Sequence, residues 1–210
     1  CKNLDVVIRN AEEDVTVVSG ALDDCKSVTW KIIDESESPL KFKVLTETTA
    51  EVIKENCVEG SVTIPSKVVI DGKTYSVVSI ASYAFKNCKG LTNITIPSSV
   101  VNIGTDAFAN SGLTTIELPS SITSIGFGLF LACSDLVSVK IPLTVGSIGE
   151  SAFVDCTSLT NLELSSSVKT IGVMAFYGCK NLDLVIDNSE DNVEVRPQAF
   201  QNCKSVTWKK

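Results

Sequence analysis

Histidine is absent from this chain of 210 residues. Because histidine is the commonest general base and the commonest metal ligand in proteins, its absence argues against hydrolase chemistry. Cys-x-x-Cys pairs are absent too, so a structural zinc site has no sequence support. We therefore expect a chain that is not an enzyme and that uses no cofactor and no metal.

Long apolar runs and excess positive charge are also lacking. No run approaches the roughly 18 to 20 apolar residues that cross a bilayer, and no basic-then-apolar leader opens the sequence, so we expect no membrane insertion. The net charge is −7 and the pI is near 4.7. An acidic surface repels nucleic acid and anionic lipid, so a neutral or basic protein partner fits better.

The sequence does contain a repeat. Six phenylalanines recur at intervals of 23, 22, 23, 23 and 24 residues, namely Phe85, Phe108, Phe130, Phe153, Phe176 and Phe200. Alanine precedes each of them except where Leu129 stands, and cysteine follows three residues later except where Ser111 stands. Between these segments the frame Leu-x-x-Ile-x-Ile-Pro recurs with small changes at 91–97, 113–119, 136–142 and 159–165.

Each part of this frame predicts a structure. The Leu-x-x-Ile-x-Ile segment alternates as a strand with one buried face does, and proline ends it because proline cannot donate to a ladder. The following Ser-Ser-Val-x-x-Ile-Gly segment predicts a second short extended run, and Ala-Phe-x-x-Cys predicts a short helical or 3₁₀ turn. One unit cannot bury its own apolar face, so the units must stack. The prediction is a right-handed, β-rich leucine-rich-repeat solenoid with a repeat of about 23 residues.

The frame resembles the BspA-like type of leucine-rich repeat, over residues 81–210 closely and over the remainder loosely. That type is found in surface proteins of bacteria and some protists. The resemblance implies an extracellular or cell-surface location and attachment to other cells or to extracellular matrix proteins.

A longer duplication divides the chain. Residues 1–31 match residues 179–209 at a constant offset of 178, with 19 identities in 31 positions. Residues 32–80 depart from the frame, with a strand expected over 40–45 and a hairpin expected over 67–78 around Asp71 and Gly72. We interpret 1–31 as a terminal repeat unit, 32–80 as a cap-like β segment with an inserted hairpin, and 81–210 as leucine-rich repeats. Cys1 then stands in mid-repeat, although an acylated lipoprotein anchor is an alternative interpretation.

Two further patterns allow a chemical or a structural interpretation. Eight cysteines allow four disulfides, but Cys133, Cys156 and Cys179 recur once per unit, which favours a ladder of buried thiols. Residues 187–192 offer oxygen ligands at alternate positions, as a calcium loop does, but a solvated turn is the simpler interpretation. The matching stretch at 9–14 has Arg9 where the first ligand would stand.

Binding is expected on the strand surface, because solenoids present such extended surfaces to protein partners. The outward residues form two predicted columns, Asn93, Thr115, Ser138 and Asn161 beside Thr95, Glu117, Lys140 and Glu163. Tyr75, Tyr83 and Tyr177 are alternative anchors on other surfaces. The predicted function is a non-enzymatic cell-surface module for adhesion or protein binding. The alternative is a structural spacer or stalk in a longer tandem array.

Overall fold

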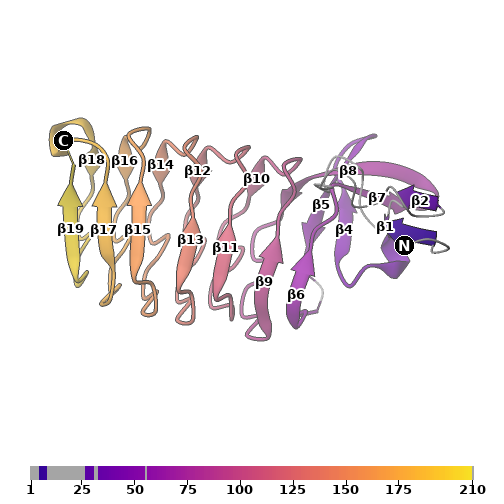
Figure 1. Cartoon of the computed structure of the whole chain (residues 1–210), viewed down its shortest axis with the longest axis horizontal. Helices are drawn as coiled ribbons and strands as arrows, with labels where there is room; N and C mark the ends of the chain where they lie inside the picture. Colours follow the sequence, from indigo (N-terminus) through magenta and orange to yellow (C-terminus); the bar gives the residue numbers. More distant parts are fainter. Residues whose placement is uncertain (1–4, 9–26, 31–32, 55, 210) are drawn as a thin grey trace.

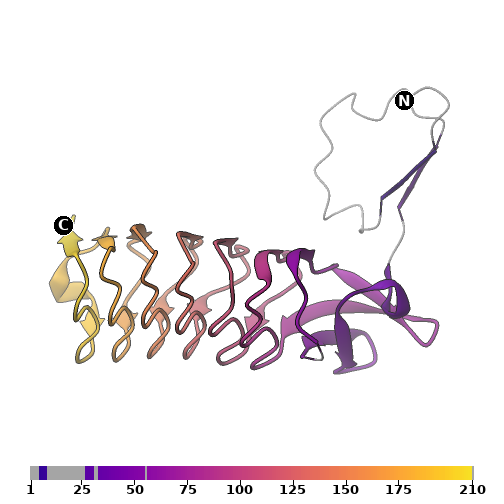
Figure 2. The same cartoon turned by 90° about the horizontal axis from the view of Figure 1, so that it is seen from below.

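The computed structural model describes residues 5–8, 27–30, 33–54 and 56–209. Cys1, Cys25 and the stretch 9–14 lie outside these residues. Strand β6 (Gly60–Thr63) and the chain after residue 80 wind into a long stack of coils, and the other strands of residues 33–80 form a sheet at one end of it (Figure 1, Figure 2). This architecture is the β-solenoid that the repeat predicts.

One side of the stack is a row of parallel strands, which we call the strand face. Its members in the described residues are β6 (Gly60–Thr63), β9 (Leu91–Thr95), β11 (Thr115–Glu117), β13 (Ser138–Lys140), β15 (Asn161–Leu164), β17 (Asp183–Ile186) and β19 (Ser205–Trp208). Strands β6, β9, β11 and β13 form one ladder, and β15, β17 and β19 form another. The ladder is interrupted between β13 and β15, although these two strands remain neighbours.

The second extended run of each coil forms a shorter parallel ladder on another side of the stack. Its strands are β10 (Asn102–Ile103), β12 (Ser124–Ile125), β14 (Ser147–Ile148), β16 (Thr170–Ile171) and β18 (Glu194–Val195). Strands β12 to β18 pair in chain order, whereas β10 pairs with the end of β8 (Lys73–Ile80). We call this surface the back ladder.

The Ala-Phe segments are consecutive four-residue turns without regular helix. In the coil that contains Phe108, the N–H of Ala109 donates to the carbonyl of Asp106 at 3.0 Å. The N–H of Ser111 donates to the carbonyl of Phe108 at 3.1 Å. Asp106 and Asn110 have φ of 52° and 56°. Because a left-handed residue on each side of the phenylalanine reverses the winding, an α-helix cannot continue through it.

These turns are joined from coil to coil by backbone hydrogen bonds. The N–H groups of Asp106, Phe108 and Asn110 donate to carbonyls of the next coil at 3.0, 3.1 and 2.7 Å. The same three positions donate in the following coils. The 3₁₀ helices of the described residues, η2 (Glu35–Glu37) and η3 (Glu190–Asn192), lie outside these turns.

The core consists of columns of identical residue types. The six repeat phenylalanines stack with ring centroids 5.0 to 6.3 Å apart and interplanar angles of at most 26°. Phe108, Phe130, Phe153 and Phe176 are fully buried. Aromatic pairs of this kind contribute about 0.5 to 1.5 kcal/mol beyond the burial of their area.

The strands of residues 33–80 other than β6 form a mixed sheet in the order β3-β7-β8-β5-β4. The strands are β3 (Ile33–Asp34), β4 (Lys41–Val44), β5 (Thr49–Ile53), β7 (Lys67–Ile70) and β8 (Lys73–Ile80). The expected hairpin is confirmed, because β7 and β8 pair antiparallel around Asp71 and Gly72 with φ of 50° and 75°. The strand expected over 40–45 is confirmed as β4.

The cysteine prediction is confirmed for the central coils and wrong for the first coil. The thiols of Cys133, Cys156 and Cys179 are free and buried, and each donates to the carbonyl of the repeat phenylalanine in the preceding coil at 3.0 to 3.1 Å. Cys88 occupies the same repeat position but forms a disulfide with Cys57. Cys88 begins the column, so a partner from the preceding segment takes the place that a carbonyl takes in later coils.

The duplicated segments share their strand pairing. Strands β1 (Asp5–Ile8) and β2 (Ser27–Trp30) pair in parallel with Asp5 opposite Ser27 and Ile8 opposite Trp30. Strands β17 and β19 pair with Asp183 opposite Ser205 and Ile186 opposite Trp208. Every pair of the first set thus maps onto a pair of the second set at the offset of 178.

Among the described glycines, Gly112 marks the tightest approach to the backbone of another coil, in the unit that is one residue short. A Cβ atom there would lie 2.0 Å from the carbonyl oxygen of Lys89. We expect Gly112→Ala to lower the free energy of unfolding by about 1 to 3 kcal/mol, because backbone must move to admit the methyl group. Urea denaturation measures the change.

Gly126→Ala is the matched control, because the nearest atom to its added Cβ is the carbonyl oxygen of Ile103 at 3.7 Å. A Gly112→Ala protein as stable as the Gly126→Ala protein would contradict the close approach.

Candidate binding surface

The strand face carries the eight residues that the sequence nominates. All eight are exposed, since each lies at an outward position of β9, β11, β13 or β15, while Ile94, Ile116, Val139 and Leu162 between them are buried. The ladder places Thr115 between Asn93 and Ser138 and places Glu117 beside Lys140. Asn161 and Glu163 continue the two columns across the interruption after β13.

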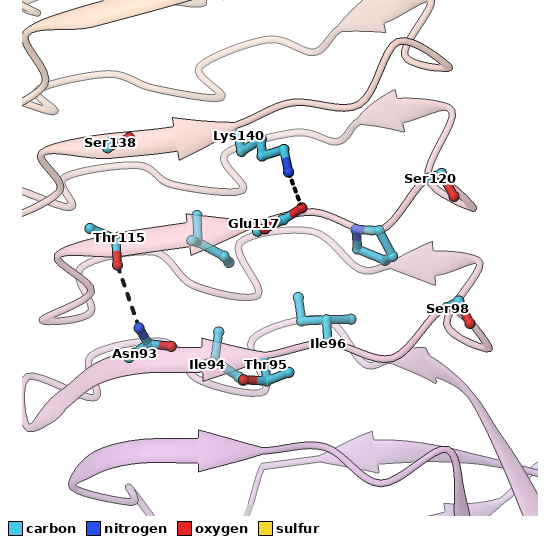
Figure 3. Close-up of a pocket in the computed structure, with 12 residues that line it drawn as sticks. Asn93, Ile94, Thr95, Ile96, Ser98, Thr115, Glu117, Ser120, Ser138 and Lys140 are labelled. Carbon is cyan, nitrogen blue, oxygen red and sulfur yellow. Dashed lines mark hydrogen bonds and ion pairs between the residues drawn. The ribbon is translucent and has the colours of Figure 1, made fainter. Parts of the chain in front are cut away.

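Interactions between neighbouring coils hold several of these side chains in place. The amide of Asn93 donates to Thr115 Oγ1 at 3.4 Å, and Lys140 Nζ lies 2.5 Å from Glu117 Oε1 (Figure 3). Glu163 of β15 forms an ion pair with Lys209, which lies two coils further along the stack, at 2.5 Å. The hydrogen bond to Glu163 raises the pKa of Lys209 above its ordinary value. Every charged member of the two columns therefore has a partner of opposite charge.

An ion pair of the same kind lies near the C-terminal end of the strand face. Asp183 accepts from Lys204 Nζ at 2.5 Å and from Ser205 Oγ at 2.6 Å. The hydrogen bond from Lys204, followed by that from Ser205, lowers the pKa of Asp183. The carboxylate therefore stays ionised over a wider pH range than an isolated aspartate does.

An open groove of about 610 Å³ crosses β9, β11 and β13 on this face (Figure 3). Six of the eight nominated residues line it, namely Asn93, Thr95, Thr115, Glu117, Ser138 and Lys140. Asn161 and Glu163 lie outside it. The strand face thus offers a hollow with hydroxyl groups, one amide and one ion pair.

Sequence reasoning missed the far end of the groove. Ser98, Pro119 and Ser120 line it there together with Ile96. These residues belong to the recurring Ile-Pro-Ser-Ser element, so the repeat frame carried the signal. From the sequence, we interpret this element as the end of a strand and do not assign it to a binding surface.

The tyrosines do not join this surface. Tyr83 is 48 % exposed on an Ala-Phe turn, where Lys86 Nζ lies 5.0 Å from its ring centroid and 2.6 Å from Asp106 Oδ2. Tyr177 lies on another such turn and Tyr75 on the β7–β8 hairpin, and both are half-buried. The structure does not bring these three tyrosines together.

The acidic stretch 187–192 forms a turn with one buried anchor. The side-chain amide of Asn188 donates to the carbonyls of Ser166 and Val168, both at 3.2 Å. Residues 190–192 form η3. Within the part of the chain that the structure describes, no three metal-ligating side chains gather at one place.

Three of the free thiols have a raised pKa. Burial raises the pKa of Cys133 and of Cys156, and burial followed by the nearby Cys179 raises the pKa of Cys203 to about 12. A thiol must ionise to act as a nucleophile, so at neutral pH these groups remain hydrogen-bond donors.

The fold and the repeat columns define a leucine-rich-repeat β-solenoid. Residues 78–207 match the model of the BspA type leucine rich repeat region in six copies, so the chain belongs to this family. Solenoids of this family are typically non-enzymatic protein-interaction or surface modules. No helix among the described residues has the length and apolar character to cross a membrane.

Solved structures agree with the family. A leucine rich cell surface protein from Faecalibacterium prausnitzii A2-165 superimposes with a TM-score of 0.67 at 26 % identity, over 80 % of this chain and 48 % of that chain. The T. pallidum leucine rich repeat protein gives 0.62 at 27 % identity, over 80 % and 82 %. A leucine-rich repeat protein from Eubacterium ventriosum gives 0.56 at 19 % identity, over 96 % and 59 %, and supports the fold alone.

The chain thus spans about half the length of the Faecalibacterium protein. A sequence search of curated proteins finds no match.

Proposed function

We propose that the chain is a cell-surface adhesion module that binds protein partners through the strand face. The groove across β9, β11 and β13 carries this proposal, since six residues nominated from the repeat line it. Extracellular matrix proteins or proteins of another cell surface are the proposed partners. The net charge of −7 disfavours nucleic acid.

Two observations support an extracellular location. The chain contains the Cys57–Cys88 disulfide. Disulfides persist in oxidising compartments and are rare in cytosolic proteins. The F. prausnitzii relative is described as a cell surface protein.

Binding of the purified chain to immobilised fibronectin, collagen, laminin and fibrinogen tests the proposal by surface plasmon resonance. We expect saturable binding to at least one of them, weakened at least about tenfold by Thr115→Arg with Lys140→Glu. The two substitutions put bulk and like charge into the groove but disturb only exposed positions, so the fold should survive.

The matched control carries Ser124→Arg with Lys169→Glu. It makes the same change in net charge at two exposed residues, one in β12 and one directly before β16. Equal losses in both variants would refute binding through the strand face. Absence of saturable binding by the unaltered chain would refute the adhesion proposal itself.

A spacer in a tandem array is the second candidate function. The identical strand pairing of β1–β2 and β17–β19 supports it, because a tandem array repeats units of the same structure. Under this proposal residues 32–80 act as the cap with which the next stack, residues 81–210, begins. Failure of the binding experiment, together with a rigid rod shape by small-angle X-ray scattering, would favour this function.

A further inference from the structure

The coil that contains β13 departs from the repeat at a prominent exposed position. After the strand-ending Pro or Ser, the neighbouring coils carry Ser98, Ser120 and Ser166, whereas this coil carries Leu143. The side chain of Leu143 is 76 % exposed, more than any other large hydrophobic residue in the described part of the chain. The repeat itself therefore indicates that serine suffices for folding at this position.

The same coil departs from the repeat a second time, at the other end of the strand. The residue before the first outward position is Thr92, Thr114 or Thr160 in the neighbouring coils and Val137 here. Val137 is 47 % exposed. Exposed apolar residues are common singly, but here two of them flank one strand, and each replaces a hydroxyl residue.

Both residues flank the strand that forms one side of the groove, although neither of them lines the groove itself. Ser98 and Ser120 line its far end, and Ser138 and Lys140 line it from β13 (Figure 3). Because Glu117 pairs with Lys140 and both strands continue without insertion, Leu143 stands one coil beyond Ser120 in the same row. Strand β13 is also the last member of its ladder. The strand on this side of the groove thus has an exposed valine before it and an exposed leucine after it, and we call β13 with these two residues the β13 wall.

The chemistry of the groove selects its occupant. Glu117 and Lys140 neutralise each other, so the groove offers no net charge to a phosphate-rich or sulfated ligand. No aromatic side chain lines it, so a sugar ring finds no stacking surface there. Its hydroxyl and amide groups suit main-chain N–H and C=O groups, and the exposed Leu143 and Val137 beside it suit apolar side chains.

We propose that the β13 wall is the energetic centre of the binding surface and that its occupant is an uncharged, extended polypeptide segment with apolar side chains that cover Val137 and Leu143. This inference rests on the proposed function and names its partner chemistry. The hydroxyl-lined groove holds the main chain of the segment, and the apolar ends of the wall provide most of the affinity.

The test restores the repeat at the two positions with Val137→Thr and Leu143→Ser. Neighbouring coils carry these residues, so the double variant keeps its fold, as its thermal unfolding verifies. The matched control is Val101→Thr, which gives the back ladder side the residue found at Thr123 and removes a valine that is 61 % exposed.

The probes are the immobilised proteins named above and a displayed library of linear 12-residue peptides selected on the unaltered chain. We expect the double variant to bind both at least about tenfold more weakly and the control to bind unchanged. We also expect selected peptides to be apolar and low in charge.

Unchanged binding by the double variant, with loss in the Thr115→Arg, Lys140→Glu variant, would overturn the inference and leave the proposed function standing. Selection of mainly charged peptides would also overturn it. No binding by the unaltered chain would overturn both.

Discussion

Phe153→Ala is expected to lower the free energy of unfolding by about 3 to 5 kcal/mol, the range for loss of a buried aromatic side chain. Phe153 is fully buried at the centre of the column, with ring centroids of Phe130 and Phe176 at 5.2 and 5.0 Å. The substitution removes both ring contacts and leaves a cavity that the rigid coils on either side cannot close.

The position of Phe153 adds a second expected effect. Each coil of a solenoid contacts only its neighbours, so a weak central coil uncouples the two halves of the array. Urea unfolding followed by circular dichroism reports on the whole stack. In a Trp30→Phe background, fluorescence of Trp208, whose ring lies 6.4 Å from that of Phe200, reports on the last coil. We expect the two transitions to coincide in the unaltered chain and to separate in Phe153→Ala.

Phe127→Ala provides the control, because Phe127 is 48 % exposed and lies outside the stacked column. We expect a loss below about 1 kcal/mol there. Comparable losses from the two substitutions would show that the phenylalanine column does not hold the coils together.

The repeat predicted the core and the strand face because both depend on periodic burial. A stacked coil buries the same positions every time, so Leu91, Leu113, Leu136 and Leu159 mark strands without any knowledge of the turns between them. The outward residues of β9, β11, β13 and β15 follow from the same alternation. Which of these outward residues border a groove depends on side-chain shape, and the period does not encode that.

The conformation of the Ala-Phe turns was less accessible, since left-handed residues are not tied to one side-chain type. Asn87, Asn110, Asp155 and Asn202 stand two residues after a phenylalanine and tolerate positive φ well. Ala132 takes the same conformation with φ of 55°, held by the hydrogen bond from its N–H to the carbonyl of Val154 at 2.7 Å. Bonds between coils, which a single unit does not reveal, select this conformation.

The repeat pattern did not predict the disulfide. Cys88 matches the ladder cysteines in spacing, while Cys57 lies in a segment without repeat register. Cys88 is the first cysteine of the column, so no preceding coil supplies a phenylalanine carbonyl that could accept its S–H group. The repeat pattern predicts contacts between equivalent coils, but it does not predict the contacts that the first coil makes with the segment before it.

Cys57→Ser is accordingly expected to lower the free energy of unfolding by about 2 to 4 kcal/mol, the usual effect of a disulfide that closes a loop of this length. The bond joins residues 31 apart. It fixes the segment over the first coil, where Lys54 Nζ donates to the Lys86 carbonyl at 2.8 Å and the Gly60 N–H donates to the Gly90 carbonyl at 2.8 Å. Without the bond, these contacts must hold the segment alone.

Thermal unfolding of the unaltered chain and of Cys57→Ser, each with and without dithiothreitol, measures the effect. The difference between the two proteins should be large without reductant and small with it, because reduction cuts the same bond that the substitution removes. Hydrogen exchange should accelerate first at residues 56–60 and at the first Ala-Phe turn, while the coils around Cys156 stay protected. A difference that persists under reduction would assign the loss to the serine rather than to the missing bond, and the disulfide would then not be what secures the first coil.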